Sequence, residues 1–214
     1  MSRVPSFFAA LMLSVSAWAQ EIAPDQLVVK ITVDVLAAIR TDKQLAAGDK
    51  QKAIKLAEEK VLPYIDFEEA TRLAVGRAWA RASPEQKARL VGEFRKMLVR
   101  TYANAVGAYR GQTLKVLPWR ASKDTASDEA TVHTQYIRAS GQPLPVDFTM
   151  RKTDTGWKVF DFVVEGVSLV LTYRSEFDAI VKQEGIDGLI KRLAQKNAPA
   201  EVAASTKADQ DGEK

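Results

Sequence analysis

The chain has 214 residues, of which 46% are hydrophobic, so it is long enough to bury a core of ordinary domain size without covalent cross-links. It contains no cysteine, which excludes a disulfide framework, a thiol nucleophile, a thiolate metal site and a lipid-modified N-terminal cysteine. The formal net charge of +4 makes it only weakly basic, and its single histidine excludes a multi-histidine metal site.

The N-terminal segment has the pattern of a secretory signal peptide. Arg3 precedes an apolar run over residues 7–13, and Ala17 and Ala19 form an A-x-A cleavage site. This run is shorter than the ~20 residues that a membrane-spanning helix needs. We therefore predict a cleaved signal peptide over residues 1–19 and a soluble exported protein that begins at Gln20.

Helical periodicity dominates the first half of the chain. The predicted helices cover residues 24–40, 49–62, 66–76 and 83–109. The third begins with a capping box at Asp66, and the fourth begins at Ser83, where an N-cap is followed by Pro84 and, three residues after the cap, by Gln86. These signals mark where the third and fourth helices begin.

The period then changes from helical to alternating. Four strands are predicted over residues 113–117, 131–138, 146–151 and 157–164, with turn signals at residues 140–141 and 153–156. Helices resume at Ser168 and at Asp187, and residues 198–214 have the composition of a disordered tail. We predict one α+β domain over residues 20–197, a curved four-stranded antiparallel sheet wrapped by about six or seven helices.

Two sequence blocks carry a family resemblance. Residues 164–169 read VEGVSL and are followed by YRSEF at 173–177. Upstream, FEEATRLAVGRAW at 67–79 is followed by SPEQ at 83–86 and by LVRTYANAV at 98–106. In this order the blocks resemble the MlaC family, also called the toluene-tolerance family, over roughly residues 27–193. The resemblance implies a protein of the Gram-negative periplasm whose sheet and helices enclose an apolar lipid cavity.

The same resemblance implies a function and partners. It describes a carrier, not an enzyme, that shuttles phospholipid between an outer-membrane complex of the lipoprotein MlaA with porin and an inner-membrane ABC transporter complex containing MlaD. Bound phospholipid is its cargo, and no metal, other cofactor or nucleic acid is expected. The protein is expected to be a monomer.

Apolar and aromatic side chains of the long helix, the sheet and the following helix are the pocket candidates. Taken singly each is typical of a core, and the resemblance makes them candidates for contact with acyl chains. The pocket candidates are Leu98, Tyr102, Val106, Phe148, Met150, Phe160, Phe162, Val164, Leu169, Tyr173 and Phe177. The candidates for contact with the head group are Arg151, Lys158 and Arg174, because a phosphate is costly to bury and should stay near the mouth.

Three alternatives remain open at this point. A related carrier could hold a hopanoid or another polycyclic lipid, which only pocket shape would distinguish. A small NTF2-like hydrolase or isomerase would use His133 with Asp147 or Asp161, although the sequence shows no recognisable acid–base constellation. A pure adaptor would use every apolar stripe as core.

Overall fold

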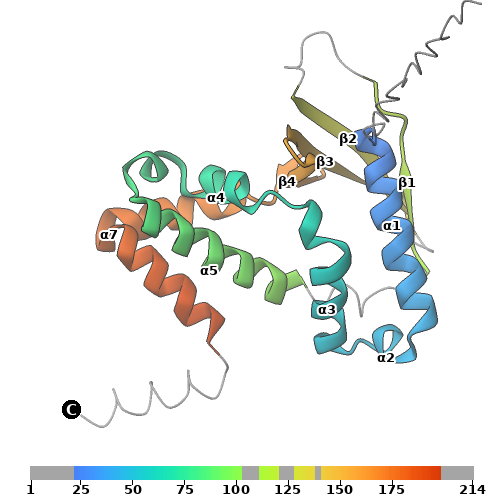
Figure 1. The fold of residues 1–214 in the computed structure, drawn as a ribbon, viewed down its shortest axis with the longest axis horizontal. Coiled ribbons are helices and arrows are strands. Elements are labelled where there is room, and N and C mark those ends of the chain that lie inside the picture. Colours follow the sequence, from blue (N-terminus) through green and yellow to red (C-terminus); the bar gives the residue numbers. More distant parts are fainter. Residues whose placement is uncertain (1–21, 103–110, 121–127, 138–140, 199–214) are drawn as a thin grey trace, which may run out of the picture.

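The structure, a computed structural model, describes residues 22–102, 111–120, 128–137 and 141–198. Within them the chain forms six α-helices, three short 3-10 helices and one five-stranded sheet (Figure 1). The predicted signal peptide, nearly all of the predicted tail and the last turns of the helix predicted over 83–109 lie outside the described residues. Among the described helices, none is both long enough and apolar enough to cross a membrane.

Side-chain caps mark two of the predicted helix starts. The α-helices are α1 (Pro24–Thr41), α2 (Lys43–Ala46), α3 (Lys50–Lys60), α4 (Phe67–Val75), α5 (Pro84–Tyr102) and α7 (Arg174–Asn197), and the 3-10 helices are η1 (Leu62–Tyr64), η2 (Gly76–Arg81) and η3 (Leu171–Tyr173). The Asp66 carboxylate accepts from the Glu69 N–H at 2.9 Å at the start of α4. Before α5, the Gln86 side chain accepts from the Ser83 N–H at 3.0 Å, which closes a capping box. The short helix α2 has no strong periodic signal and was not predicted.

The sheet is an antiparallel meander in which strands follow one another in chain order. Its strands are β1 (Thr113–Val116), β2 (Glu129–Ile137), β3 (Leu144–Thr153), β4 (Gly156–Val164) and β5 (Val167–Ser168). The pairing of β3 with β4 shifts register between Thr149 and Met150, which leaves Phe160 without an opposite partner. Such a bulge increases the local bend and twist. Val159, Phe160 and Asp161 are consequently all buried, which strict alternation would not give.

The prediction of four strands was wrong by one. Glu165 and Gly166 both have positive φ, 50° and 81°, and they form a two-residue turn that pairs Val167 back onto Val164. The resulting strand β5 has only two residues, too few to show an alternating pattern. The turn and β5 matter for the site because they direct the chain toward the helices.

The region after β5 also differs from the prediction. Ser168 is in β5 instead of starting a long helix. Its hydroxyl accepts from the N–H of Leu171, the first residue of η3, at 3.0 Å. The regular helix α7 begins at Arg174 and is interrupted at Gly185, whose φ of 73° and ψ of −176° are not helical. The helical break therefore lies two residues before the predicted second start at Asp187.

Hydrophobic side chains form three separate clusters. The helical cluster joins α4, α5 and α7 around Phe94, Phe177 and Leu90. The sheet cluster packs Leu27 and Val28 of α1 against one face of β2, β3 and β4. A smaller cluster joins α1, α2 and α3. Figure 1 shows the consequence: α4, α5 and α7 gather on one side, the sheet and α1 lie on the other, and α3 lies between them.

Candidate functional site: an apolar cavity between two cores

A cavity of about 400 Å³ lies where α3, α4 and α5 approach the ends of β3 and β4. The described residues that line it are Ala57, Val61, Leu62, Ile65, Phe67, Ala70, Leu98, Val99, Tyr102, Val146, Phe160, Phe162, Val164, Leu169 and Val170. All of these side chains are aliphatic or aromatic. Among them the only side-chain polar atom is the hydroxyl oxygen of Tyr102. The cavity can therefore bind an apolar group, and its described lining offers no carboxylate, ammonium, guanidinium or imidazole group.

The cavity separates the helical cluster from the sheet cluster. Ala70, Val170 and Leu98 belong to the helical cluster or pack against it. Ile65 and Phe162 on the opposite wall pack against the sheet cluster. Since each wall is supported by its own core, the space between them can exist without an unpacked region inside either core.

The structure places ten of the eleven apolar candidates in three groups. Those that line the cavity are Leu98, Tyr102, Phe160, Phe162, Val164 and Leu169. Phe148 and Met150 pack in the sheet cluster, with the Phe148 ring 5.1 Å from that of Phe162. Tyr173 and Phe177 pack in the helical cluster. Val106 lies outside the described residues. The register of the strands and the boundaries of the clusters decide which of these side chains reach the cavity.

The three cations predicted to meet a head group are all bound to protein groups. The Arg151 Nε donates to the Asp66 carboxylate at 2.6 Å, the Lys158 Nζ to the Pro63 carbonyl at 2.6 Å, and the Arg174 Nε to the Leu73 carbonyl at 2.9 Å. None is among the described residues that line the cavity. These contacts tie β3 and β4 to the η1–α4 connection and close the C-terminal end of α4. The role of these cations toward a lipid stays a prediction.

A buried carboxylate holds one wall of the cavity in place. Asp161 is 6% exposed. Its carboxylate accepts from the Ser168 hydroxyl at 2.5 Å and from the Val170 N–H at 3.0 Å. Since Leu169 and Val170 line the cavity, these bonds fix the position of that wall against β4. Asp161, considered from the sequence as an acid–base candidate, instead has backbone and hydroxyl partners.

The other residues of the hypothetical acid–base site lie outside the cavity. His133 Nδ1 is 3.0 Å from the Asp147 carboxylate in the paired strands β2 and β3. The His133 side chain is 63% exposed. Neither residue is among those that line the cavity. In the described part of the chain, histidine and acidic side chains form no group of three that could hold a metal ion.

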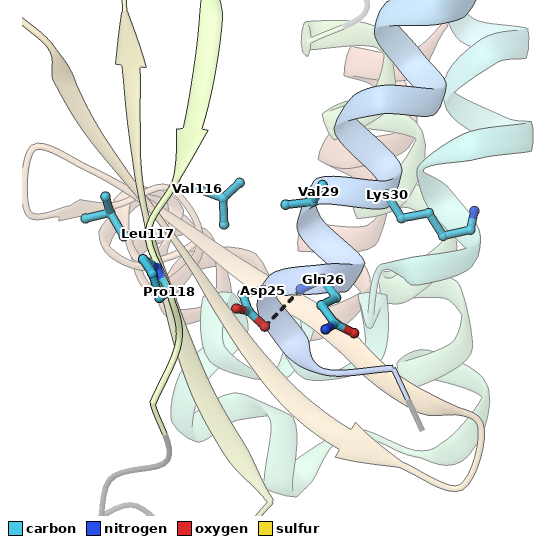
Figure 2. Close-up of a pocket in the computed structure, with 7 residues that line it drawn as sticks. All are labelled: Asp25, Gln26, Val29, Lys30, Val116, Leu117 and Pro118. Atoms are coloured by element: carbon cyan, nitrogen blue, oxygen red, sulfur yellow. Dashed lines mark hydrogen bonds between the residues drawn. The ribbon is translucent and has the colours of Figure 1, made fainter. Parts of the chain in front are cut away.

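A second hollow, of about 340 Å³, lies between α1 and the chain at the end of β1 (Figure 2). Val29 and Val116 lie on its two sides, and Asp25, Gln26 and Lys30 give it a mixed polar lining. The Asp25 carboxylate accepts from the Gln26 N–H at 2.9 Å and from the Trp119 N–H at 3.2 Å, so it joins α1 to the segment after β1. Three of its seven lining residues are polar or charged, whereas the described lining of the cavity has a single polar side-chain atom.

Sequence reasoning missed the wall that α3 and η1 contribute. Ala57, Val61 and Leu62 line the cavity, followed by Ile65 in the connection to α4. Their spacing of four, one and three residues is helical, so an apolar stripe at the end of the predicted helix 49–62 was the available signal. That this stripe faces β4 depends on tertiary packing, so it could not be predicted from local periodicity.

Comparisons with known proteins agree with this architecture. The family model for MlaC protein matches residues 30–195. The intermembrane phospholipid transport system binding protein MlaC of Haemophilus influenzae is 24% identical over 179 residues, which is 82% of each chain. The toluene tolerance protein ttg2D of Pseudomonas putida is 24% identical over 184 residues, covering 85% of this chain and 84% of that one.

A solved structure gives the same result in three dimensions. The phospholipid-binding protein from Ralstonia solanacearum, solved in complex with a phospholipid, superposes with a TM-score of 0.72 and 34% sequence identity. The match covers 81% of this chain and 96% of that chain. With the family model spanning most of the described residues, this chain belongs to the MlaC protein family.

Proposed function

We propose that this chain is a periplasmic phospholipid carrier that encloses acyl chain in the cavity, keeps the head group at the mouth, and makes or breaks no bond. The observation that carries the proposal is the cavity itself, whose described lining is apolar apart from one hydroxyl. The relatives named above support the choice of phospholipid as cargo. The predicted signal peptide supports the periplasm as the compartment.

The free energy of hydration explains why such a carrier is needed. Burial of one methylene is worth about 0.8 kcal/mol, so two acyl chains with about thirty methylenes would cost on the order of 24 kcal/mol to hold in water. Free diffusion of the lipid between membranes is then negligible. A cavity that replaces the contacts of the bilayer removes most of that cost without a catalytic residue.

The volume of the cavity limits what it holds in this conformation. An apolar cavity of about 150 Å³ accommodates benzene, which sets a scale of about 25 Å³ per carbon atom. On that scale a cavity of about 400 Å³ takes about sixteen carbons, close to one acyl chain. A two-chain lipid therefore requires the helical wall and the sheet wall to move apart.

Transfer also needs a donor and an acceptor. Membership of the MlaC family favours an outer-membrane complex containing MlaA and an inner-membrane ABC transporter containing MlaD as these two. A passive carrier cannot bias the equilibrium between them, so the direction of net transfer is set by the partners and their use of ATP.

Extraction of the cargo tests the proposal directly. Organic extraction of the purified protein, followed by mass spectrometry, should release phospholipid in stoichiometric amount. A polycyclic lipid in the extract would instead favour the hopanoid carrier, and the absence of any lipid would favour an adaptor.

Delipidated protein should also melt at a lower temperature than loaded protein, because an empty apolar cavity loses packing and burial. A ligand at a hundred times its Kd stabilises the native state by about 2.7 kcal/mol, so added phospholipid should raise Tm by several degrees. Glycerophosphate, which has the charged group without acyl chains, should give almost no protection. Equal protection by glycerophosphate would contradict binding through acyl chains.

The enzymatic alternative makes a different prediction for the only histidine. His133→Ala should leave lipid occupancy and the rate of transfer between donor and acceptor vesicles nearly unchanged, because the exposed imidazole lies outside the cavity. General acid–base catalysis typically contributes about 10²-fold or more. A loss of that size in a folded variant would restore the hydrolase or isomerase hypothesis.

A further inference from the structure

Two tyrosine hydroxyls meet beside the cavity. Tyr102, at the end of α5, lines the cavity and is 42% exposed, which places it at the boundary between cavity and solvent. The Tyr173 hydroxyl oxygen, from η3, lies 3.5 Å from the Tyr102 hydroxyl oxygen. Hydrogen bonds between hydroxyls are typically about 2.7–2.8 Å long. The two groups are therefore close together without a short bond that would occupy them.

Packing fixes the direction of one of these hydroxyls. The Tyr173 ring makes an edge contact with Phe94 at 5.3 Å and a tilted contact with Phe177 at 5.7 Å, and both phenylalanines are fully buried. Burial, together with the contact to Tyr102, raises the pKa of the Tyr173 phenol. The hydroxyl therefore stays protonated at neutral pH and remains able to donate.

The position of the pair matches the place where a bound lipid changes from apolar to polar. An acyl chain inside the cavity ends at an ester, and beyond it lies the phosphate. Both groups present oxygen acceptors and no strong donor. The predicted cations Arg151, Lys158 and Arg174 already bind protein groups, whereas the tyrosines offer two donors at the rim.

From this juxtaposition we infer that Tyr102 and Tyr173 together donate to one acceptor oxygen of the cargo, an ester carbonyl or phosphate oxygen at the junction of acyl chain and head group. The inference rests on the proposed function and adds a polar specificity element to it. Apolar contacts with the cavity set the affinity for the chain, and the two hydroxyls set how far the chain enters.

Three ligands with one hexadecyl-length chain separate these contributions. Palmitoyl lysophosphatidylcholine has both an ester and a phosphate, hexadecylphosphocholine has only the phosphate, and hexadecyltrimethylammonium has neither acceptor. Titration calorimetry below the micelle concentration would compare the wild-type protein with Tyr102→Phe, Tyr173→Phe and the double variant. Tyr136→Phe is the matched control, because Tyr136 lies in β2 and is not among the residues that line the cavity.

We expect each single variant to bind lysophosphatidylcholine about tenfold more weakly, the size of a lost hydrogen bond to a charged or strongly polar acceptor. The affinity of the double variant should fall by less than the product of the two single effects, because both hydroxyls donate to the same oxygen. Binding of hexadecyltrimethylammonium should not change in any variant. If the variants lose affinity for hexadecylphosphocholine to the same extent, the contact is with the phosphate. If their affinity for hexadecylphosphocholine is unchanged, the contact is with the ester.

Unchanged binding of all three ligands by the double variant would overturn the inference and leave the carrier function intact. An equal loss for hexadecyltrimethylammonium would also overturn it, since the hydroxyls would then act only through packing. If the wild-type protein binds none of the ligands and no phospholipid, the proposed function itself fails.

Discussion

Replacement of Ala57 by tryptophan is expected to lower the affinity for phospholipid by at least about a hundredfold while the protein remains folded. Ala57 is half-buried on α3, and its side chain lines the cavity. An indole would fill more than half of a volume of about 400 Å³, on the scale of about 25 Å³ per carbon. Each methylene excluded from the cavity weakens binding about fourfold. Mass spectrometry of protein incubated with phospholipid vesicles would measure the remaining occupancy.

The matched control is Ala88→Trp. Ala88 lies on the exposed face of α5, so the same change in side chain and helix propensity is made away from the cavity. It should bind lipid like the wild type, and circular dichroism should show both variants folded. Full occupancy of Ala57→Trp would mean that acyl chain binds elsewhere on the protein.

Asp161→Ala should cause the largest loss of stability, about 3 kcal/mol. The substitution removes the acceptor for the Ser168 hydroxyl and for the Val170 N–H, and Val170 is only 2% exposed. A buried donor left without a partner costs about 1–3 kcal/mol, and a hydrogen bond to a charged group is worth about 1.5–3 kcal/mol. For a protein of this size the loss corresponds to a fall in Tm of about 6–12 °C, which scanning calorimetry would detect.

Two further variants separate the causes of that loss. Ser168→Ala removes one donor to the carboxylate and the acceptor for the Leu171 N–H, and it leaves the Val170 bond. Leu171 is exposed, so its N–H can bond to water, and the cost should be about 1 kcal/mol. Asp161→Asn keeps one oxygen that can accept from the Val170 N–H. Its loss of stability should therefore lie between those of Ser168→Ala and Asp161→Ala. If Asp161→Ala melts like the wild type, the carboxylate does not hold this wall of the cavity.

The order of elements and the antiparallel sheet could be predicted from the sequence because local signals specify them. Caps at Asp66 and Ser83 mark the starts of α4 and α5, and alternating residues mark β2, β3 and β4. The bulge at Phe160 has no local signal. It arises from the register between two strands and determines which aromatic side chains of β4 reach the cavity.

The polar part of the site was harder to predict for a different physical reason. A basic residue near an expected lipid mouth is a reasonable candidate for a phosphate contact, yet its partner depends on the tertiary fold. Arg174 binds the Leu73 carbonyl, 101 residues away in the chain. The convergence of Tyr102 and Tyr173 is also a long-range contact. Sequence periodicity carries no information about either distance.

The wall formed by α3 and η1 has a consequence for how this protein can evolve. In the described part of the chain, Ala57, Val61 and Leu62 line the cavity but belong to none of the three hydrophobic clusters. Substitutions there change the space offered to cargo with little effect on the packing that maintains the fold. Selection can therefore adjust the range of chain lengths and branching that descendants accept, one residue at a time, without passing through unfolded intermediates.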